Sequence, residues 1–404
     1  MNWKHKIIAL IRLQAGWSNT RVCCLLGIGL TVVVLVGCLP VEVDVSQDGR
    51  LLIPRQEGFF ILDSASGKVT PAFQPKGGQA VFARFVPASK QIVVVTDAGE
   101  GGPSIPGMGG GGEKLMLVNL ADGSTKNLLT AQNVTYLTIS PDGKFAAYTR
   151  LGDNQTDLGE NNKETLPELH ILDLNTGADR ALGDVGGVAS MHRWFADSKS
   201  LLVFHIEKKM KQNYSGTLCR LDVASGKTEP LAGAIGSNNV VLDVSPDGKM
   251  GIFTAIAAGT AGTELKSKEE NQQGGSKLFQ VSIDKKTVRQ ALEDITFARF
   301  SPDGKRVLLY GQVQNKGGLK TADANFANIQ LIANDATMQV GGDPASSANV
   351  YPNWVGNDRV SYLAQHAVYG KAGKNLELMV AGIDGKEHRS YQSSIDAEAR
   401  KGER

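Results

Sequence analysis

The sequence predicts an all-β chain, folded as a seven-bladed β-propeller of four-stranded antiparallel blades behind an N-terminal signal or anchor helix. Three observations predict this fold: a turn motif that recurs at near-constant spacing, a second strand–turn–strand element after each copy, and no sustained helical period after residue 37. Repeats of about 50 residues that hold four strands each are typical of propeller blades. Because the first repeat is only about 40 residues long, a six- or eight-bladed ring is the alternative.

The turn motif is SPDGK, which occurs three times, around Asp142, Asp247 and Asp303. Weaker copies read SQDGR, VPASK, FADSK and VGNDR. Proline sets φ for a tight turn, aspartate accepts bonds from nearby N–H groups, and glycine adopts the left-handed conformation. Calcium needs about six to eight oxygen ligands, whereas each blade offers one such aspartate. We therefore interpret these aspartates as turn formers that join the first strand, A, to the second, B.

A second turn, rich in aspartate and glycine, joins strands C and D of each unit, as in LHILDLNTGADRAL at 169–182. The predicted propeller spans 38–392, and residues 393–404 are expected to form a polar tail. The predicted blades cover about 41–73, 80–130, 133–183, 186–233, 237–292, 293–341 and 347–392.

Residues 1–37 predict a lipoprotein signal peptide. They carry four basic residues and no acidic one, and they end in a 16-residue apolar run at 22–37. Such a run is short for a membrane span, which needs about 20 residues, and suits a signal-peptide core. The sequence LVGC at 35–38 resembles the lipobox of bacterial lipoproteins, which implies cleavage between Gly37 and Cys38 and lipid attachment to Cys38. An uncleaved anchor helix is the alternative.

Either alternative attaches the chain to a membrane, with the propeller on the periplasmic or outer side of a bacterial cell envelope. Removal of residues 1–37 leaves 39 basic and 41 acidic residues, so the mature chain lacks the basic footprint of a nucleic-acid-binding protein. Cys219 is the only other cysteine of the mature chain, and a lipidated Cys38 therefore excludes an internal disulfide. The sequence does not indicate an oligomeric state.

The SPDGK turns, followed by LDLNTG-like turns, resemble the WD40-like repeats of the TolB family, which are periplasmic propellers of bacteria. The resemblance covers nearly the whole mature chain and implies the propeller fold. The separate N-terminal domain of TolB has no counterpart here, because strand A of blade 1 begins directly after Cys38.

The connections between strands B and C are expected to be long in six blades and to leave the same face of the ring. They cover 97–113, 151–168, 206–216, 257–276, 311–328 and 364–375. Insertions that recur on one face usually mark a binding face. The chain also enters blade 1 on this face, so we expect the lipid anchor and the long loops to lie together.

One position of strand A is polar in all seven blades, and the next position is apolar in all seven. The polar residues are Asp44, Arg84, Thr138, Arg193, Asp243, Arg299 and Asn353. Alternation along a strand places the two sets on opposite faces, so we expect the polar set to approach the central channel. Either these charges pair with one another and with water, or Arg84, Arg193 and Arg299 hold an anionic ligand.

No zinc-hydrolase motif and no G-x-S-x-G nucleophile motif occurs in the chain. We predict no catalytic residue, cofactor or metal site, and favour a scaffold that binds an envelope protein or polymer through the loop face. The alternative is a polysaccharide lyase or hydrolase with its site at the channel mouth, where His205 and His366 are candidate ligands. His192 is expected to be a core histidine, because alternation turns it toward a blade interface.

Overall fold

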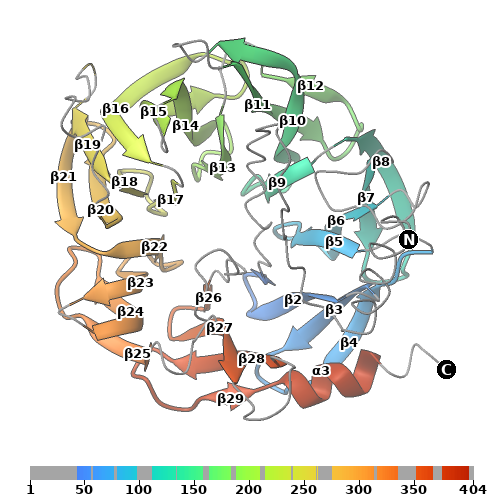
Figure 1. Cartoon of the computed structure of the whole chain (residues 1–404). Helices are drawn as coiled ribbons and strands as arrows, with labels where there is room; N and C mark the ends of the chain where they lie inside the picture. The colour runs from blue at the N-terminus through green and yellow to red at the C-terminus, as the bar shows by residue number, and fades with distance from the viewer. Residues whose placement is uncertain are drawn as a thin grey trace, which may run out of the picture.

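The computed structural model describes most of the chain from residue 43 to residue 399. The described residues are 43–55, 58–76, 80–97, 112–132, 134–157, 163–182, 188–209, 214–237, 240–260, 262, 275–313, 316–334, 352–366 and 375–399. They form seven antiparallel sheets arranged in a ring around a central axis (Figure 1), which confirms the predicted seven-bladed propeller. The predicted signal peptide and Cys38 lie outside these ranges. Within them, no helix is long and apolar enough to cross a membrane.

The four strands A to D of each blade pair in the order in which they occur in the sequence. Blade 1 consists of β1 (Asp44–Val45), β2 (Arg50–Arg55), β3 (Gly58–Asp63) and β4 (Val69–Phe73). Blade 2 consists of β5 (Ala80–Phe85), β6 (Gln91–Asp97), β7 (Glu113–Asn119) and β8 (Thr125–Ala131). Blade 3 consists of β9 (Val134–Ile139), β10 (Phe145–Asp157), β11 (Lys163–Asp173) and β12 (Asp179–Ala181).

The remaining blades follow the same order. Blade 4 consists of β13 (Val188–Trp194), β14 (Ser200–Lys209), β15 (Tyr214–Asp222) and β16 (Thr228–Ser237), and blade 5 of β17 (Leu242–Val244), β18 (Met250–Ala255), β20 (Lys277–Ser282) and β21 (Thr287–Leu292). Blade 6 consists of β22 (Ile295–Phe300), β23 (Arg306–Val313), β24 (Lys316–Asp323) and β25 (Gln330–Asn334). Blade 7 consists of β26 (Asn353–Val355), β27 (Arg359–His366), β28 (Asn375–Gly382) and β29 (Arg389–Ser390).

The long connections differ from the expected loops in blades 3 to 6. In blade 3, strands β10 and β11 extend through most of 151–168 as a longer hairpin. In blade 4, strands β14 and β15 extend over 206–209 and 214–216 of the expected connection. After strand B of blade 5, the short strand β19 (Ala257–Thr260) pairs with β16 and becomes a fifth strand of blade 4. Most of the other B–C connections lie outside the described residues.

The prediction of a long connection at 311–328 in blade 6 was wrong, because residues 316–323 form strand C. The run of glycines in this segment reads as a turn, yet Gly311 and Gly318 face each other across the β23–β24 pair. A Cβ atom on Gly318 would lie 2.1 Å from the carbonyl oxygen of Ala333. These glycines are therefore needed for the close approach of strands within the sheet.

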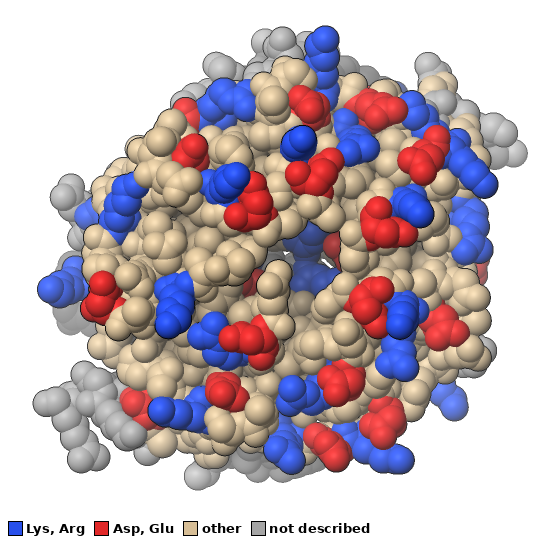
Figure 2. Space-filling model, turned by 180° about the vertical axis from the view of Figure 1, so that it is seen from behind, with Lys and Arg blue, Asp and Glu red and all other residues tan. Residues whose placement is uncertain are grey.

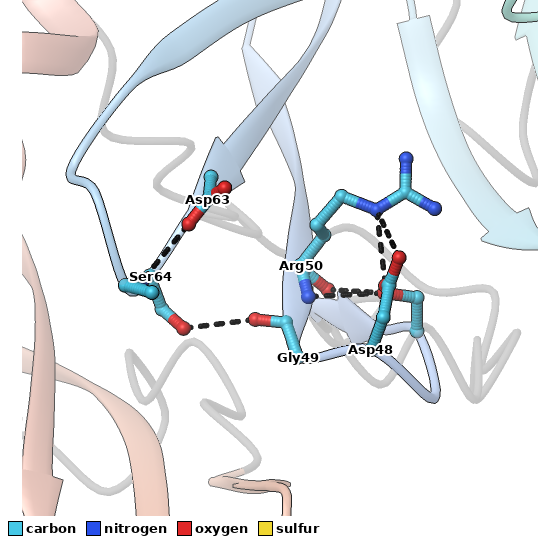
Figure 3. Close-up of polar contacts among 7 residues, drawn as sticks. Asp48, Gly49, Arg50, Asp63 and Ser64 are labelled. Carbon is cyan, nitrogen blue, oxygen red and sulfur yellow. Dashed lines mark hydrogen bonds and ion pairs between the residues drawn. The ribbon is translucent and has the colours of Figure 1, made fainter.

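The aspartates of the SPDGK motif close the turns between strands A and B. In blade 3, Ser140 Oγ donates to Asp142 Oδ1 at 2.7 Å, and Lys144 N donates to the same oxygen at 3.1 Å. Gly143 adopts a φ of 71°. In blade 1, Asp48 accepts from Arg50 Nε at 2.9 Å (Figure 3).

The A–B turns also connect neighbouring blades. Asp142 N donates to Ser198 Oγ in the turn of blade 4, at 3.0 Å. Asp303 N donates to Asn357 Oδ1 in the turn of blade 7, also at 3.0 Å. A turn of one blade thus uses the side chain of the next turn to satisfy its backbone donor.

The apolar residues that follow the polar ring positions pack between blades, as expected from the alternation. They are Val45, Phe85, Ile139, Trp194, Val244, Phe300 and Trp354. The indole of Trp354 also donates to the carbonyl of Arg299 in the preceding blade, at 3.1 Å.

Side chains and a C-terminal helix close the ring, because blades 7 and 1 share no strand. Tyr391 OH donates to the carbonyl of Ser64 at 2.9 Å. Residues 393–404 were expected to be a polar tail, but Gln392–Ala399 form helix α3, which lies beside β4 (Figure 1). Ile395 of this helix is buried in the apolar cluster between blades 7 and 1, and Asp396 pairs with Arg55 of blade 1.

We predict that Ile395→Ala destabilises the propeller by about 2–5 kcal/mol, the usual cost of truncating a buried aliphatic side chain. Ile395 is only 1% exposed and lies where the ring closes. Urea unfolding measures the change, with Ser394→Ala on the exposed side of α3 as the control. Equal stability of the two variants would contradict a closing role for α3.

We predict that replacing Asp142, Asp247 and Asp303 together by asparagine lowers the free energy of unfolding at pH 7. Near pH 2 the same replacement should change this free energy little. The hydrogen bond from Ser245 lowers the pKa of Asp247, and similar bonds outweigh burial and lower the pKa of the other two. The ionised carboxylates therefore stabilise the fold above the ordinary value of 3.8, and this contribution is lost as the pH falls through the lowered pKa.

Urea unfolding at pH 7 and near pH 2 checks this prediction. The control is Asp358→Asn, at a carboxylate whose side chain is 80% exposed. A stability gap between wild type and the triple variant that widens in acid would show that the turns are not held by ionised carboxylates.

Candidate functional site

A cavity of about 500 Å³ lies on the propeller axis. Six of the seven polar ring positions line it: Asp44, Arg84, Thr138, Arg193, Arg299 and Asn353. Figure 2 shows a central opening with lysine or arginine side chains at its depth. Strand A therefore brings together, at one level of the channel, side chains that are far apart in the sequence.

The mouth of this cavity is formed by A–B turns. Ser46 and Asp48 of blade 1, Pro87 and Ser89 of blade 2, and Pro141 of blade 3 line it. The cavity thus opens on the face opposite the B–C connections. The sequence argument placed the binding face on the B–C side and did not anticipate a cavity among the short turns.

Arg193 connects three blades at the floor of the cavity. Its Nη1 donates to Tyr136 OH of blade 3, and its guanidinium lies over the Tyr136 ring, 5.6 Å from the centroid. Its Nε lies 3.6 Å from Asp243 Oδ1 of blade 5. The sequence argument missed Tyr136, although it lies two residues before Thr138 and alternation therefore places both on the same strand face.

Asp243, the seventh ring residue, does not line the cavity but supports its floor. It accepts from Phe300 N at 2.8 Å, across the interface between blades 5 and 6. Burial raises the pKa of Asp243, while Arg193 and Arg299 act against that rise. The carboxylate therefore compensates positive charge within the ring.

The same arrangement recurs between blades 1 and 2. Asp44 accepts from Phe85 N at 2.6 Å. In both places the donating amide belongs to the residue after an arginine of the ring, Arg84 in blade 2 and Arg299 in blade 6. An aspartate on one blade and an arginine on the next thus form a repeated structural unit.

Arg84 and Asn353 use their side chains to hold neighbouring backbone. Arg84, which is buried, donates from Nε to the carbonyl of Leu137 at 3.1 Å and from Nη1 to that of Ala83 at 3.0 Å. Asn353 donates from Nδ2 to the carbonyl of Val43 at 3.2 Å. Both residues therefore position strand A as well as line the cavity.

Two buried polar atoms among the described residues have no hydrogen-bond partner: Thr138 Oγ1 and His192 Nδ1. His192 is fully buried, and its Nε2 bonds the carbonyl of Ala147 at 3.0 Å. Burial lowers the pKa of His192 to about 4, so the ring is neutral at physiological pH. His192 is therefore the core histidine that alternation predicted.

Of the other candidate residues, only the side chain of His205 is described, and it does not line the cavity. His205 is half-buried in β14, and burial lowers its pKa. The side chain of His366 and residues Gly37 and Cys38 are outside the described part of the chain. The described residues contain no group of three or more histidine, cysteine, aspartate or glutamate side chains that could hold a metal.

The charged side chains of the cavity make it suited to binding an anion. Its charged wall consists mainly of arginine, which stays protonated at any physiological pH and cannot exchange protons in a reaction. An arrangement of fixed cations at the end of a channel can attract a carboxylate or phosphate.

Together the fold and the cavity define a class: seven-bladed propellers with a polar axial cavity. No family model and no curated protein matches the sequence. Among solved structures, the chain resembles an oligogalacturonate lyase in complex with manganese, at 13% identity over 84% of this chain and 88% of that one, with a TM-score of 0.57.

Other solved structures with the same fold include an acylaminoacyl peptidase, at 14% identity over 86% of this chain and 51% of that one, with a TM-score of 0.51. The chain is also similar to TolB from Acinetobacter baumannii, at 15% identity over 83% of this chain and 77% of that one, with a TM-score of 0.48. At these identities the likenesses to the lyase and the peptidase show the fold alone.

We predict that wild-type protein loses stability relative to Asp243→Asn as the pH rises above the ordinary aspartate value of 3.8. A carboxyl whose pKa is raised by folding stabilises the native state while it is protonated, and this contribution is lost as the pH rises through the folded-state pKa. Asparagine cannot ionise and lacks this dependence. Urea unfolding of both proteins between pH 3.5 and pH 7 measures the difference in their free energies of unfolding. If wild type becomes more stable relative to Asp243→Asn as the pH rises, the prediction is wrong.

Proposed function

We propose that this protein is a lipid-anchored propeller of the bacterial cell envelope, which binds an envelope protein or polymer through acidic groups. The observation that carries this proposal is the axial cavity, whose floor holds Arg84, Arg193 and Arg299. Buried cations attract anionic groups more strongly than exposed ones, because the surrounding dielectric is low.

The topology supports an orientation for this binding. The chain enters blade 1 at the start of β1, the end of strand A that lies away from the cavity mouth. A lipid on Cys38 would hold that end near the bilayer, so the cavity mouth would face away from the membrane. The hypothesis that the B–C connections also contact a partner stays a prediction.

A lyase or hydrolase was the alternative function. We do not propose it, because no arrangement of the described residues favours it over binding.

The test is cross-linking in intact bacterial envelopes, followed by capture of the protein with its partner. We expect a variant with Arg84, Arg193 and Arg299 changed to glutamine to lose the partner, because the attraction for acidic groups is removed. The matched control changes Lys144, Lys249 and Lys305 of the A–B turns to glutamine, which removes the same charge outside the cavity.

Two further measurements complete the test. Thermal unfolding establishes that the arginine variant is folded, and the single variant Arg193→Gln replaces it if it is not. Cys38→Ser should release the protein from the membrane fraction. Equal capture by the arginine variant and the lysine control would contradict the proposal.

A further inference from the structure

The polar ring contains more arginine than aspartate: three arginines and two aspartates occupy five of the seven positions. Asp44 accepts from the amide of the residue after Arg84, and Asp243 accepts from the amide of the residue after Arg299. Arg193 is the third arginine and shares Asp243, at 3.6 Å, with Arg299.

Blade 3 contributes the neutral position of this part of the ring. Thr138 lies between the ring positions of blades 2 and 4, which are Arg84 and Arg193. The backbone of Thr138 is adjacent to blade 4, because its carbonyl lies 3.5 Å from the Trp194 indole nitrogen. The guanidinium of Arg193 reaches the same strand, at Tyr136.

The hydroxyl of Thr138 has no hydrogen-bond partner among the described residues, although its Oγ1 is buried. A buried hydroxyl without a partner is costly, and it usually persists because something else requires it. Thr138 lines the cavity and is itself only half-buried. Threonine has more than one accessible χ1 rotamer, so a rotation would present this hydroxyl to a ligand in the cavity.

The wall next to this position is apolar. Phe85, Ile139 and Trp194, each on the neighbouring position of strand A, line the same cavity together with Val45 and Pro87. A ligand that reaches Thr138 and Arg193 therefore also contacts aromatic and aliphatic surface. Such contact favours an apolar body over one covered with hydroxyl groups.

We propose that the cavity binds a single carboxylate attached to an apolar body, and that Thr138 and Arg193 hold the carboxylate between blades 3 and 4. One oxygen accepts from the Arg193 guanidinium and the other from the Thr138 hydroxyl. This inference rests on the proposed function, because it specifies the acidic group that the cavity takes.

The test uses full-length protein in detergent, with phenylacetate as the probe and phenylacetamide as its uncharged counterpart. Calorimetric titration and thermal unfolding measure binding. We expect phenylacetate to bind and phenylacetamide not to bind. Thr138→Val should weaken phenylacetate binding by about ten-fold or more, the effect of losing a hydrogen bond to a charged group. Thr138→Ser keeps the hydroxyl and should bind within a few-fold of wild type.

The same valine variant has an opposite expected effect on the free protein. It removes a hydroxyl that lacks a partner and keeps the branched shape, so the ligand-free variant should unfold at a higher temperature than wild type. A residue with only a structural role would not combine higher stability with weaker binding. A lower unfolding temperature, or unchanged phenylacetate binding, would overturn the inference.

Further probes test the remaining parts. Tighter binding of galacturonate would overturn the apolar body, and tighter binding of inorganic phosphate would overturn the single carboxylate. Loss of phenylacetate binding in Thr138→Val supports the inference even if no envelope partner is captured, in which case the proposed function alone fails. Capture of a partner that depends on the three arginines, with no effect of Thr138→Val on either ligand, would leave the proposed function and overturn the inference.

Discussion

The structure depends on contacts between the innermost strands of neighbouring blades. Apart from the β16–β19 pair, which connects blades 4 and 5, strand pairing stabilises single blades and does not connect one blade to the next. Side chains do this instead: Asp44 and Asp243 accept backbone N–H groups of the following blade, and Trp354 donates to a carbonyl of the preceding one. Because a buried polar backbone group needs a partner, these bonds fix the height of each blade relative to the next.

This constraint also explains the composition of the axial cavity. Seven strands meet at the axis, and ring residues of six of them line the cavity, so polar groups from distant parts of the chain are brought together. Desolvation makes isolated charges costly there, and aspartates are accordingly found beside arginines. The groups that hold the blades in register are thus the same groups that give the cavity its electrostatic character.

The sequence predicted the ring well because its signals are local and repeated. The period of the A–B turns shows the number of blades, and alternation from each turn identifies the ring positions and places His192 in the core. The predictions from sequence were wrong where contacts with a distant part of the chain, rather than local residue preferences, decide the structure. Gly311 and Gly318 read as a loop but sit in a sheet, and α3 becomes ordered through Ile395, which needs blade 1 to bury it. The unpartnered hydroxyl of Thr138 depends on three-dimensional neighbours and could not be read from any pattern.

The ring also shows why structural and binding roles can be separated within one cavity. Asp44 and Asp243 accept backbone amides, and Arg84 donates to carbonyls, so these residues are required for blade packing whether or not a ligand is present. The Thr138 hydroxyl makes no such bond among the described residues and carries a cost to the free protein. Replacing a packing residue changes stability and binding in the same direction, whereas a residue retained for a ligand changes them in opposite directions. That difference in sign, more than the size of either effect, identifies which ring positions serve recognition.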